Sequence, residues 1–284
     1  MAYERFSNLR ALDSMTEAMD YAVVGPTDSR IHEIHTTRFP FNTVCHVERD
    51  FGDGIWRGCS GVLIGPRKVL TAAHCVFSPT FGRAPQRIRI TPGRADRETV
   101  PYGRMIAREA YAARRFVEAP NNRHPDRRDF DYGLVVLPRP FARLDRFMPV
   151  AVASEELFRS IGAGPMITIA GYPGDRPVGT MWRHSERLKK VTPRRLLYTV
   201  DTCPGHSGSP IWTRGKQDGK VLIIGVHTSG ILDEQGRPYG CGKGVVLAPT
   251  GLSNSGVRII PEIRAALADP QMRDKGKKVM SRVL

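Results

Sequence analysis

Short hydrophobic runs, separated by clusters of Gly, Pro and Asp, dominate the chain between positions 43 and 137. The clearest run is Arg87-Ile88-Arg89-Ile90-Thr91, in which charged and apolar residues alternate. This two-residue period is typical of a strand that is buried on one face. Further runs rich in Val, Leu and Ile occupy residues 61–64, 69–71 and 134–137. Short strands with frequent turn signals predict an all-β barrel or sandwich.

A second set of strand-like runs occupies residues 166–170, 195–200, 220–226 and 257–260. We therefore expect two β lobes, at about 40–140 and 150–260, within one domain that covers residues 23–268. Proline at the first turn and an apolar side predict a short helix over Pro261–Ala268. Residues 1–22 are expected to be an extension or pro-segment, with an amphipathic helix in 1–20. The basic tail, residues 269–284, is expected to be loose.

The composition is that of an ordinary globular protein except for its charge. The chain has 284 residues, enough for two packed lobes, and no apolar run long enough to cross a bilayer. Its 43 Lys and Arg against 28 Asp and Glu give a formal charge of +15. Such a charge attracts acidic proteins, nucleic acid or anionic surfaces. We find no nucleic-acid signature or zinc spacing, so protein or peptide partners are expected rather than nucleic acid.

Two separated segments carry the candidate chemistry. Thr202 to Pro210 reads TCPGHSGSP and places Ser207 between glycines, and Thr71 to Cys75 reads TAAHC and contains His74. A seryl hydroxyl is a poor nucleophile at neutral pH unless an imidazole accepts its proton. The serine segment alone also fits a plain polar turn. Together, the two segments favour an acyl-transfer site in which the amides of Gly205 and Ser207 bind the oxyanion.

The third member of such a triad is sought in residues 129–137, which read DFDYGLVVL. Asp129 and Asp131 have the same strand parity, so alternation does not distinguish them. We choose Asp131, because it leads directly into the apolar strand and is held away from water. Asp129 is the alternative, interpreted as an exposed loop acid. The order His74, Asp131, Ser207 is that of chymotrypsin-like enzymes rather than subtilisins or α/β-hydrolases.

Four of the five cysteines form two candidate disulfides. Cys59 and Cys75 are sixteen positions apart, and a bridge between them would tether the His74 loop; it would stabilise the fold by about 3 kcal/mol. Cys203 and Cys241 form the second pair, which leaves Cys45 unpaired. Disulfides indicate an oxidising, secreted or periplasmic location. Residues 1–22 do not resemble a signal peptide, so the two indications about location conflict.

Several ordered segments of the chain resemble the bacterial glutamyl endopeptidases of the chymotrypsin-like family. They include TTRFPF at 36–41, TPGR at 91–94, GYPGD at 171–175, the 201–210 segment and VHT at 226–228. The resemblance covers about residues 23–265. It implies two antiparallel six-stranded β-barrels with a short C-terminal helix. It also implies a serine endopeptidase whose triad lies between the barrels, and no cofactor or metal.

The resemblance also suggests which substrates are cleaved. The positions that match the family's carboxylate-binding pocket are Thr202 and His227, so cleavage after Glu or Asp is expected. A hydroxyl and an imidazole N–H suit a carboxylate because charge-assisted hydrogen bonds are strong. For His227 the alternative is a core histidine. Asp201, six residues before Ser207, favours the competing prediction of cleavage after Arg or Lys.

His206 bears on how the protein is activated. It stands where digestive proteases carry the aspartate that receives a freed N-terminus, so activation by that contact is excluded. Removal of residues 1–22 is expected instead, with the new α-amino group near the pocket. The alternative is that residues 1–22 are an ordinary extension.

Two other functions compete with the endopeptidase. One is a catalytically silent binding protein with the protease fold, and the other is nucleic-acid binding. His184 is predicted to be structural.

Overall fold

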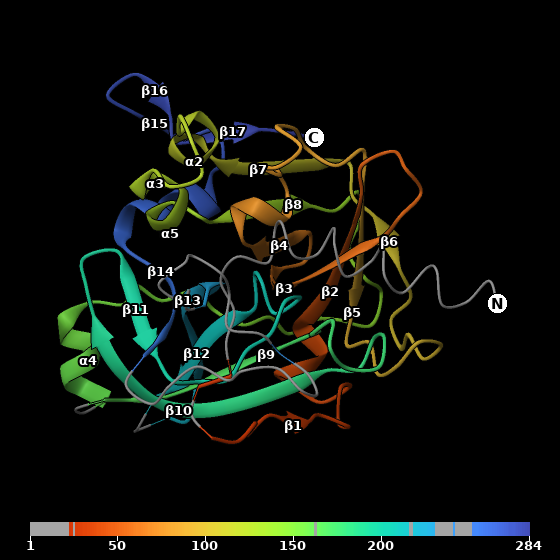
Figure 1. Ribbon diagram of the computed structural model, residues 1–284, viewed down its shortest axis with the longest axis vertical. Coiled ribbons are helices and arrows are strands. Elements are labelled where there is room, and N and C mark those ends of the chain that lie inside the picture. Colours follow the sequence, from red (N-terminus) through yellow and green to blue (C-terminus); the bar gives the residue numbers. More distant parts are fainter. Residues whose placement is uncertain (1–22, 25, 162–163, 216–217, 231–240, 242–251) are drawn as a thin grey trace.

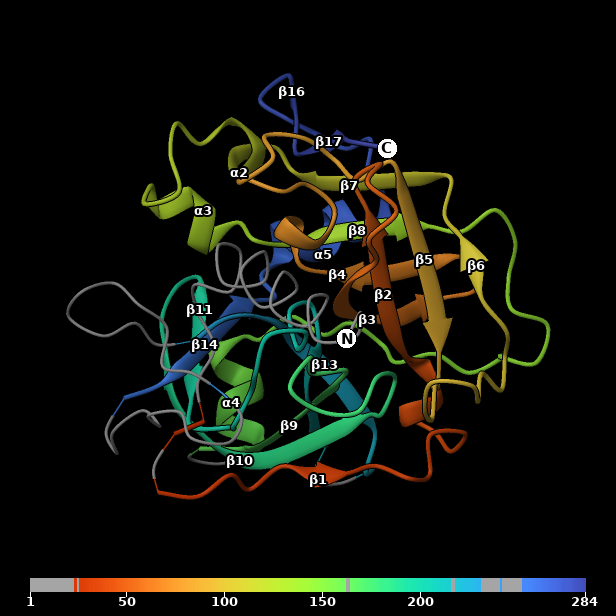
Figure 2. The same cartoon turned by 45° about the vertical axis from the view of Figure 1, so that its right-hand side comes forward.

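The computed structural model describes residues 23–24, 26–161, 164–215, 218–230, 241 and 252–284. The sequence-predicted helix in residues 1–20 lies outside these residues. Figure 1 shows two β-sheets, one above the other, with helices at the flanks, and Figure 2 shows the same arrangement from another side. Within the described part of the chain, no helix is long and apolar enough to span a membrane.

The first sheet is antiparallel and curled. Its strand order is β17-β7-β8-β4-β3-β2-β5-β6. The bounds are β2 (Val44–Asp50), β3 (Arg57–Gly65), β4 (Lys68–Thr71), β5 (Arg87–Pro92), β6 (Met105–Ile106), β7 (Glu109–Ala113), β8 (Gly133–Val136) and β17 (Met280–Arg282). The alternating run at positions 87–91 forms β5, with Ile88 and Ile90 fully buried. Alternation thus correctly predicted both the strand and its buried face.

The second sheet closes into a six-stranded barrel. Its order is β1-β10-β11-β14-β13-β12-β9, and a further pairing of β9 with β10 completes the circle. The bounds are β1 (Ile31–His32), β9 (Met166–Gly171), β10 (Trp182–Val191), β11 (Arg195–Tyr198), β12 (Pro210–Arg214), β13 (Val221–Ser229) and β14 (Asn254–Arg258). The mostly β class is confirmed, with one closed barrel and one open, curled sheet in place of two six-stranded barrels.

In the residues that the structure describes, the helices are few and short. They are η1 (Phe41–Thr43), η2 (Ala73–Cys75), α2 (Arg114–Glu118), α3 (Pro125–Asp129), α4 (Glu155–Ile161) and α5 (Pro261–Ala268). The predicted C-terminal helix is confirmed as α5, which buries Ile263, Ala266 and Leu267. Proline at its first turn lacks an N–H that would be unpaired there in any case.

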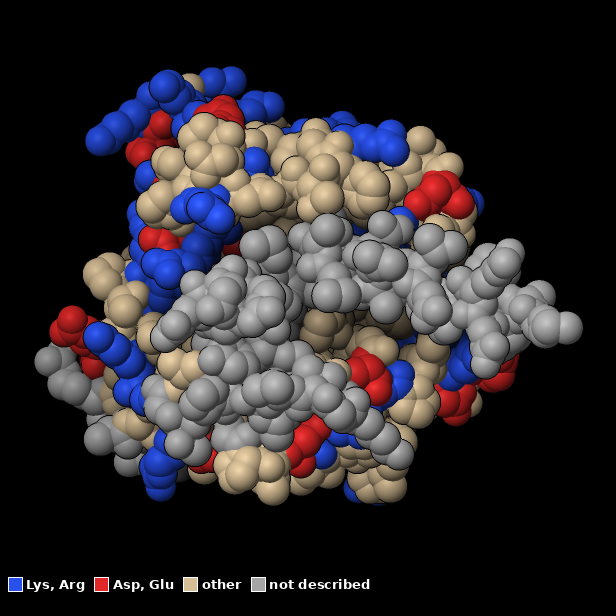
Figure 3. Space-filling view, in the orientation of Figure 1, with Lys and Arg blue, Asp and Glu red and all other residues tan. Residues whose placement is uncertain are grey.

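The prediction of a loose C-terminal tail is wrong. β15 (Arg273–Asp274) and β16 (Lys277–Lys278) form a hairpin, and β17 then pairs antiparallel with β7. Met280 is 1% exposed and belongs to the core of the first lobe. The segment is rich in charged residues, which favour a solvated tail, and its sequence shows no sign that Met280 is buried. The basic side chains gather over the β15–β16 hairpin at the upper left of Figure 3.

Candidate active site

His74 and Asp131 meet in the first lobe. His74 lies in η2, directly after β4, and Asp131 lies between α3 and β8. The His74 Nδ1 and Asp131 Oδ2 atoms are 2.7 Å apart, and the His74 backbone N–H donates to Asp131 Oδ1 at 3.0 Å. Two hydrogen bonds therefore fix both the ring and its backbone on one carboxylate. This contact leaves the other ring nitrogen, Nε2, on the side facing away from Asp131.

Asp129 lies elsewhere. Its Oδ1 atom is 3.7 Å from Nε of Arg128, an exposed side chain at the end of α3. The structure therefore brings Asp131, rather than Asp129, to His74. The carboxylate of Asp131 is 6% exposed, whereas that of Asp129 is 27% exposed. Asp131 is therefore the more shielded of the two, whereas Asp129, expected to be an exposed loop acid, is half-buried at the end of α3.

Ser207 lies in a turn that packs against the His74 segment. Gly208 follows Ser207 with φ +82°, a conformation that favours glycine. A Cβ at Gly208 would lie 2.2 Å from Thr71 Oγ1 and 2.9 Å from the Ala72 nitrogen. Only glycine permits this close approach, which places the Ser207 turn against the residues that immediately precede His74.

Every peptide carbonyl from Pro204 to Ser207 is held by a donor. Pro204 O accepts from the Gly174 N–H at 2.7 Å, and His206 O accepts from the Ser209 N–H at 2.9 Å. A trans peptide directs its N–H opposite to its C=O. The N–H groups of Gly205 and Ser207 therefore point away from Gly174 and from the Ser209 nitrogen, respectively.

Ser60 lies in β3 of the first lobe and binds the two remaining carbonyls, those of Gly205 and Ser207. Its Oγ donates to Gly205 O at 2.7 Å and accepts from the Tyr172 N–H at 2.9 Å, while its backbone N–H donates to Ser207 O at 2.7 Å. The intervening amides donate elsewhere, that of His206 to Cys203 O and that of Gly208 to His227 O. Sequence analysis missed Ser60, because its role depends on contact with residues more than 140 positions away.

The two predicted disulfides are confirmed. Cys59 is bonded to Cys75 and Cys203 to Cys241, and they tether the His74 loop and the start of the Ser207 turn. Cys45 is free and buried. In the described residues, the one group with metal-ligand geometry consists of Cys59, His74 and Cys75. Because both sulfurs are committed to the disulfide and His74 Nδ1 to Asp131, this group does not suit a metal ion.

The predicted pocket residues are brought near the turn. His227 in β13 is fully buried, and its Nδ1 atom is 2.7 Å from the Tyr198 hydroxyl. Burial, reinforced by the charges of His206, Arg195 and His74, holds the pKa of His227 well below its usual value. Thr202 is fully buried, and in the described part of the chain its Oγ1 atom has no hydrogen-bond partner.

Both carboxylate oxygens of Asp201 accept hydrogen bonds from backbone N–H groups near the N-terminal end of the described chain. Its Oδ1 accepts from the Val24 N–H and its Oδ2 from the Ser29 N–H, both at 2.8 Å. Burial raises the pKa of this carboxyl, although these amides oppose the shift. The Asp201 amide donates to His184 Nδ1 at 2.8 Å, and the same ring nitrogen lies 3.4 Å from Asp201 Oδ2.

Comparisons with known proteins place these features in a family. The family model described as Trypsin matches residues 30–245. A glutamyl endopeptidase of Bacillus licheniformis is 29% identical over 213 residues, which make up 74% of this chain and 61% of the relative. An extracellular metalloprotease of Bacillus subtilis is 28% identical over 74% of this chain and 63% of its own length. The chain thus spans less than two thirds of these curated relatives.

Solved structures show the same fold. A Glu endopeptidase solved in complex with MPD superposes with a TM-score of 0.66 at 23% identity, over 88% of this chain and 100% of the other. The protease Anisep from Arthrobacter nicotinovorans superposes with a TM-score of 0.55 at 17% identity, over 81% of this chain and 93% of the other. At these identities the likeness concerns the fold.

The buried histidines predict a pH-dependent stability. Burial and the charge of Arg30 lower the pKa of His206 to about 4, whereas an unfolded histidine titrates near 6.5. The unfolded chain therefore binds an extra proton between these values, so stability falls as the pH falls. From pH 7 to pH 5, we expect His206 to account for a loss of about 2 kcal/mol in the free energy of unfolding.

Urea unfolding of the unchanged chain and of two variants measures this contribution. Asn in place of His206 retains an acceptor for the Cys203 N–H but does not titrate, so His206→Asn should show a smaller drop from pH 7 to pH 5. The exposed His35 provides the matched control, and His35→Asn should behave like the unchanged chain. An equal drop in all three proteins would contradict the assignment.

Proposed function

Because the chain belongs to the trypsin family, we propose that it is a serine endopeptidase in which Ser207, His74 and Asp131 form the catalytic triad. The observation that carries the proposal is the double hydrogen bond from His74 to Asp131, made beside the Ser207 turn. Asp131 accepts the Nδ1 proton of His74 and thereby fixes the tautomer. His74 Nε2 then serves as the base for the Ser207 hydroxyl.

The reaction follows from these roles. As Ser207 Oγ attacks the scissile carbonyl, its proton passes to His74, and the imidazolium is stabilised by Asp131. The tetrahedral intermediate collapses when His74 returns the proton to the leaving amine. Water repeats the sequence on the acyl-enzyme and releases the second product. No step requires a metal or an organic cofactor.

We further propose that the N–H groups of Gly205 and Ser207 form the oxyanion hole. The support is the arrangement of the neighbouring peptides, since the carbonyls of Pro204 and His206 are bound on the opposite side. Gly205 has φ +99°, and a Cβ there would lie 2.4 Å from Tyr172 O, so the turn requires glycine. Donors that are fixed before the reaction need no reorganisation when charge develops.

Cleavage after Glu is the specificity that the site supports best. Thr202 Oγ1 is a buried hydroxyl that has no partner among the described residues, and His227 lies in β13, which pairs with the β12 strand that follows the Ser207 turn. Both suit a carboxylate as hydrogen-bonding groups. The competing specificity for Arg or Lys depends on Asp201, but both oxygens of Asp201 already accept backbone amides. A carboxylate bound in this way anchors Val24 and Ser29.

Paired peptides that differ only in Glu or Arg before the cut test activity and specificity together. The Glu peptide should be cleaved faster, and Ser207→Ala should lower kcat by about four to six orders of magnitude, because the nucleophile is lost. Ser185→Ala, which removes a half-buried hydroxyl on β10, is the control and should retain activity. Preference for Arg would reject the specificity, and full activity of Ser207→Ala would reject the mechanism.

We also propose that residues 1–22, which lie outside the described structure, are a pro-segment. The support is the contact between the Val24 nitrogen and Asp201, because a chain that begins at Val23 or Val24 would have its α-amino cation at or next to this nitrogen. N-terminal sequencing of active protein should therefore give Val23 or Val24 as the first residue. Active protein that begins at Met1 or Ala2 would overturn the proposal.

A further inference from the structure

Arg195 is a buried guanidinium whose hydrogen-bond acceptors in the described part of the chain are all neutral. The residue lies at the start of β11 and is 5% exposed. One terminal nitrogen donates to Thr228 Oγ1 at 3.0 Å and to the Arg128 carbonyl, and the other donates to Ser229 Oγ at 3.1 Å and to Ser255 Oγ. Among the described residues, no carboxylate forms an ion pair with Arg195.

Arg30 is a buried arginine that, unlike Arg195, has carboxylate partners. Its side chain is fully buried and forms ion pairs with Asp28 at 2.7 Å and Asp175 at 2.6 Å. Burial of a charge without a partner costs free energy, and the pKa of Arg195 is lowered by this burial. Asp131 and Asp129 act on Arg195 at longer range, and Asp131 is committed to His74. The described residues therefore compensate the positive charge of Arg195 only in part.

The location of this charge connects it with the pocket. Arg195 binds the side chains of Thr228 and Ser229, which directly follow His227 in β13. The charge of Arg195 is also one of the causes that lower the pKa of His227, after burial and the charge of His206. His227 is consequently neutral at pH 7, and Thr202 carries no charge. Neither candidate pocket residue supplies the positive charge that a substrate carboxylate needs.

We propose that Arg195 determines specificity, because its buried charge favours a substrate carboxylate held by His227 and Thr202 over the neutral amide of the same shape. This inference rests on the proposed endopeptidase function. Arg195 acts through its electric field from behind the strand and does not contact the substrate. In a shielded site such a field is only weakly screened, so a carboxylate gains from it where an amide does not.

The test compares peptides that carry Glu or Gln before the cut, because these side chains differ in charge and hardly in shape. Arg195→Gln retains hydrogen-bonding capacity toward Thr228 and Ser229 but removes the charge. We expect the ratio of kcat/KM for Glu over Gln to fall about tenfold or more, with cleavage of the Gln peptide little changed. Arg195→Lys keeps the charge and should retain most of the ratio.

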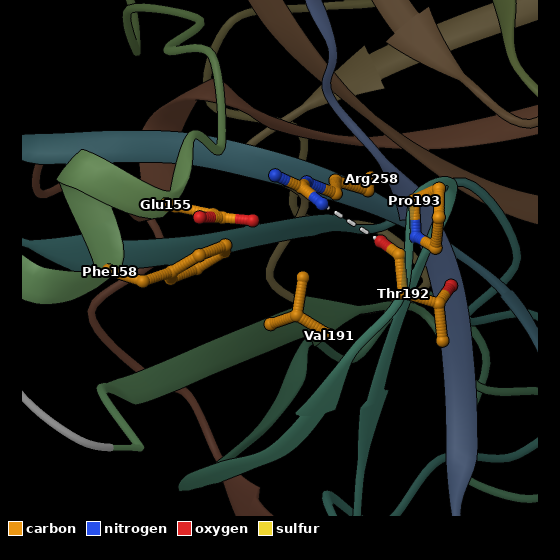
Figure 4. Close-up of a pocket in the computed structure, with 6 residues that line it drawn as sticks. All are labelled: Glu155, Phe158, Val191, Thr192, Pro193 and Arg258. Carbon is orange, nitrogen blue, oxygen red and sulfur yellow. Dashed lines mark hydrogen bonds between the residues drawn. The ribbon is translucent and has the colours of Figure 1, made fainter.

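Arg258 of β14 provides the matched control. Its guanidinium donates to the carbonyls of Ala153 and Thr192 at 2.7 and 2.9 Å, and burial lowers its pKa. It faces Glu155 and Phe158 in a pocket of about 510 Å³ that shares no residue with the proposed site (Figure 4). Arg258→Gln also removes a positive charge from the second lobe, but it should leave the Glu-over-Gln ratio unchanged.

A second variant neutralises the charge while Arg195 stays in place. Ser255→Asp puts a carboxylate where Arg195 now donates to a hydroxyl, and it should lower the ratio as Arg195→Gln does. Ser255→Asp provides the test if Arg195→Gln does not fold. The inference about Arg195 would be overturned, without affecting the proposed function, if the Glu-over-Gln ratio of kcat/KM were unchanged in either folded variant. It would also be overturned if Arg258→Gln lowered this ratio as much as Arg195→Gln does. Equal cleavage of both peptides by the unchanged chain would instead reject the proposed Glu specificity together with this inference.

Discussion

The orientation of four consecutive peptide groups in the Ser207 turn is the constraint on which the proposed chemistry depends. Each carbonyl from Pro204 to Ser207 accepts a hydrogen bond, and Ser60 provides two of the four donors. Ser60 belongs to the first lobe, whereas the turn precedes β12 of the second. The contact between the lobes therefore orients the Gly205–His206 and Ser207–Gly208 peptides, which alternate with the two peptides that carry the Gly205 and Ser207 amides.

The second requirement is the close approach of backbone to backbone. Gly208 packs on Thr71 and Ala72, and Gly171 leaves room for the Ser60 hydroxyl, which would lie 2.5 Å from a Cβ at that position. The His74 loop, tethered by the Cys59–Cys75 disulfide, approaches from the same lobe as Ser60. Thus one lobe supplies the proposed base, its carboxylate and the Ser60 contacts to the turn, and the other supplies the turn and the candidate pocket.

The sequence predicted those parts of the molecule that local patterns specify. Alternation in residues 87–91 identified β5 and its buried side, and proline followed by an apolar stripe identified α5. Chain order and spacing pointed to His74, Asp131 and Ser207 and to both disulfides. The choice between Asp131 and Asp129 could not come from strand parity, because residues two apart point to the same side.

The parts that sequence analysis missed depend on contacts between distant residues. Ser60 is one polar residue in an apolar strand, and nothing nearby in the sequence indicates that it reaches Gly205, 145 positions away. Arg195 is one of 43 basic residues, and only the fold shows that it is buried among hydroxyls without an ion pair in the described region. The tail was misjudged for a related reason, since its charges outnumber the single buried side chain of Met280.

The central claim is that the Ser60 hydroxyl of the first lobe fixes the Gly205–His206 peptide, which lies between the two peptides that carry the proposed oxyanion-binding amides. Steady-state kinetics of Ser60→Ala measure it most directly, with Thr43→Val as the control, because Thr43 is also a buried hydroxyl bound to a backbone carbonyl in the first lobe. We predict that Ser60→Ala lowers kcat by about tenfold to hundredfold with little change in KM, since the lost interaction matters in the transition state. Thr43→Val should keep the kcat of the unchanged chain. An undiminished kcat in Ser60→Ala would contradict the account.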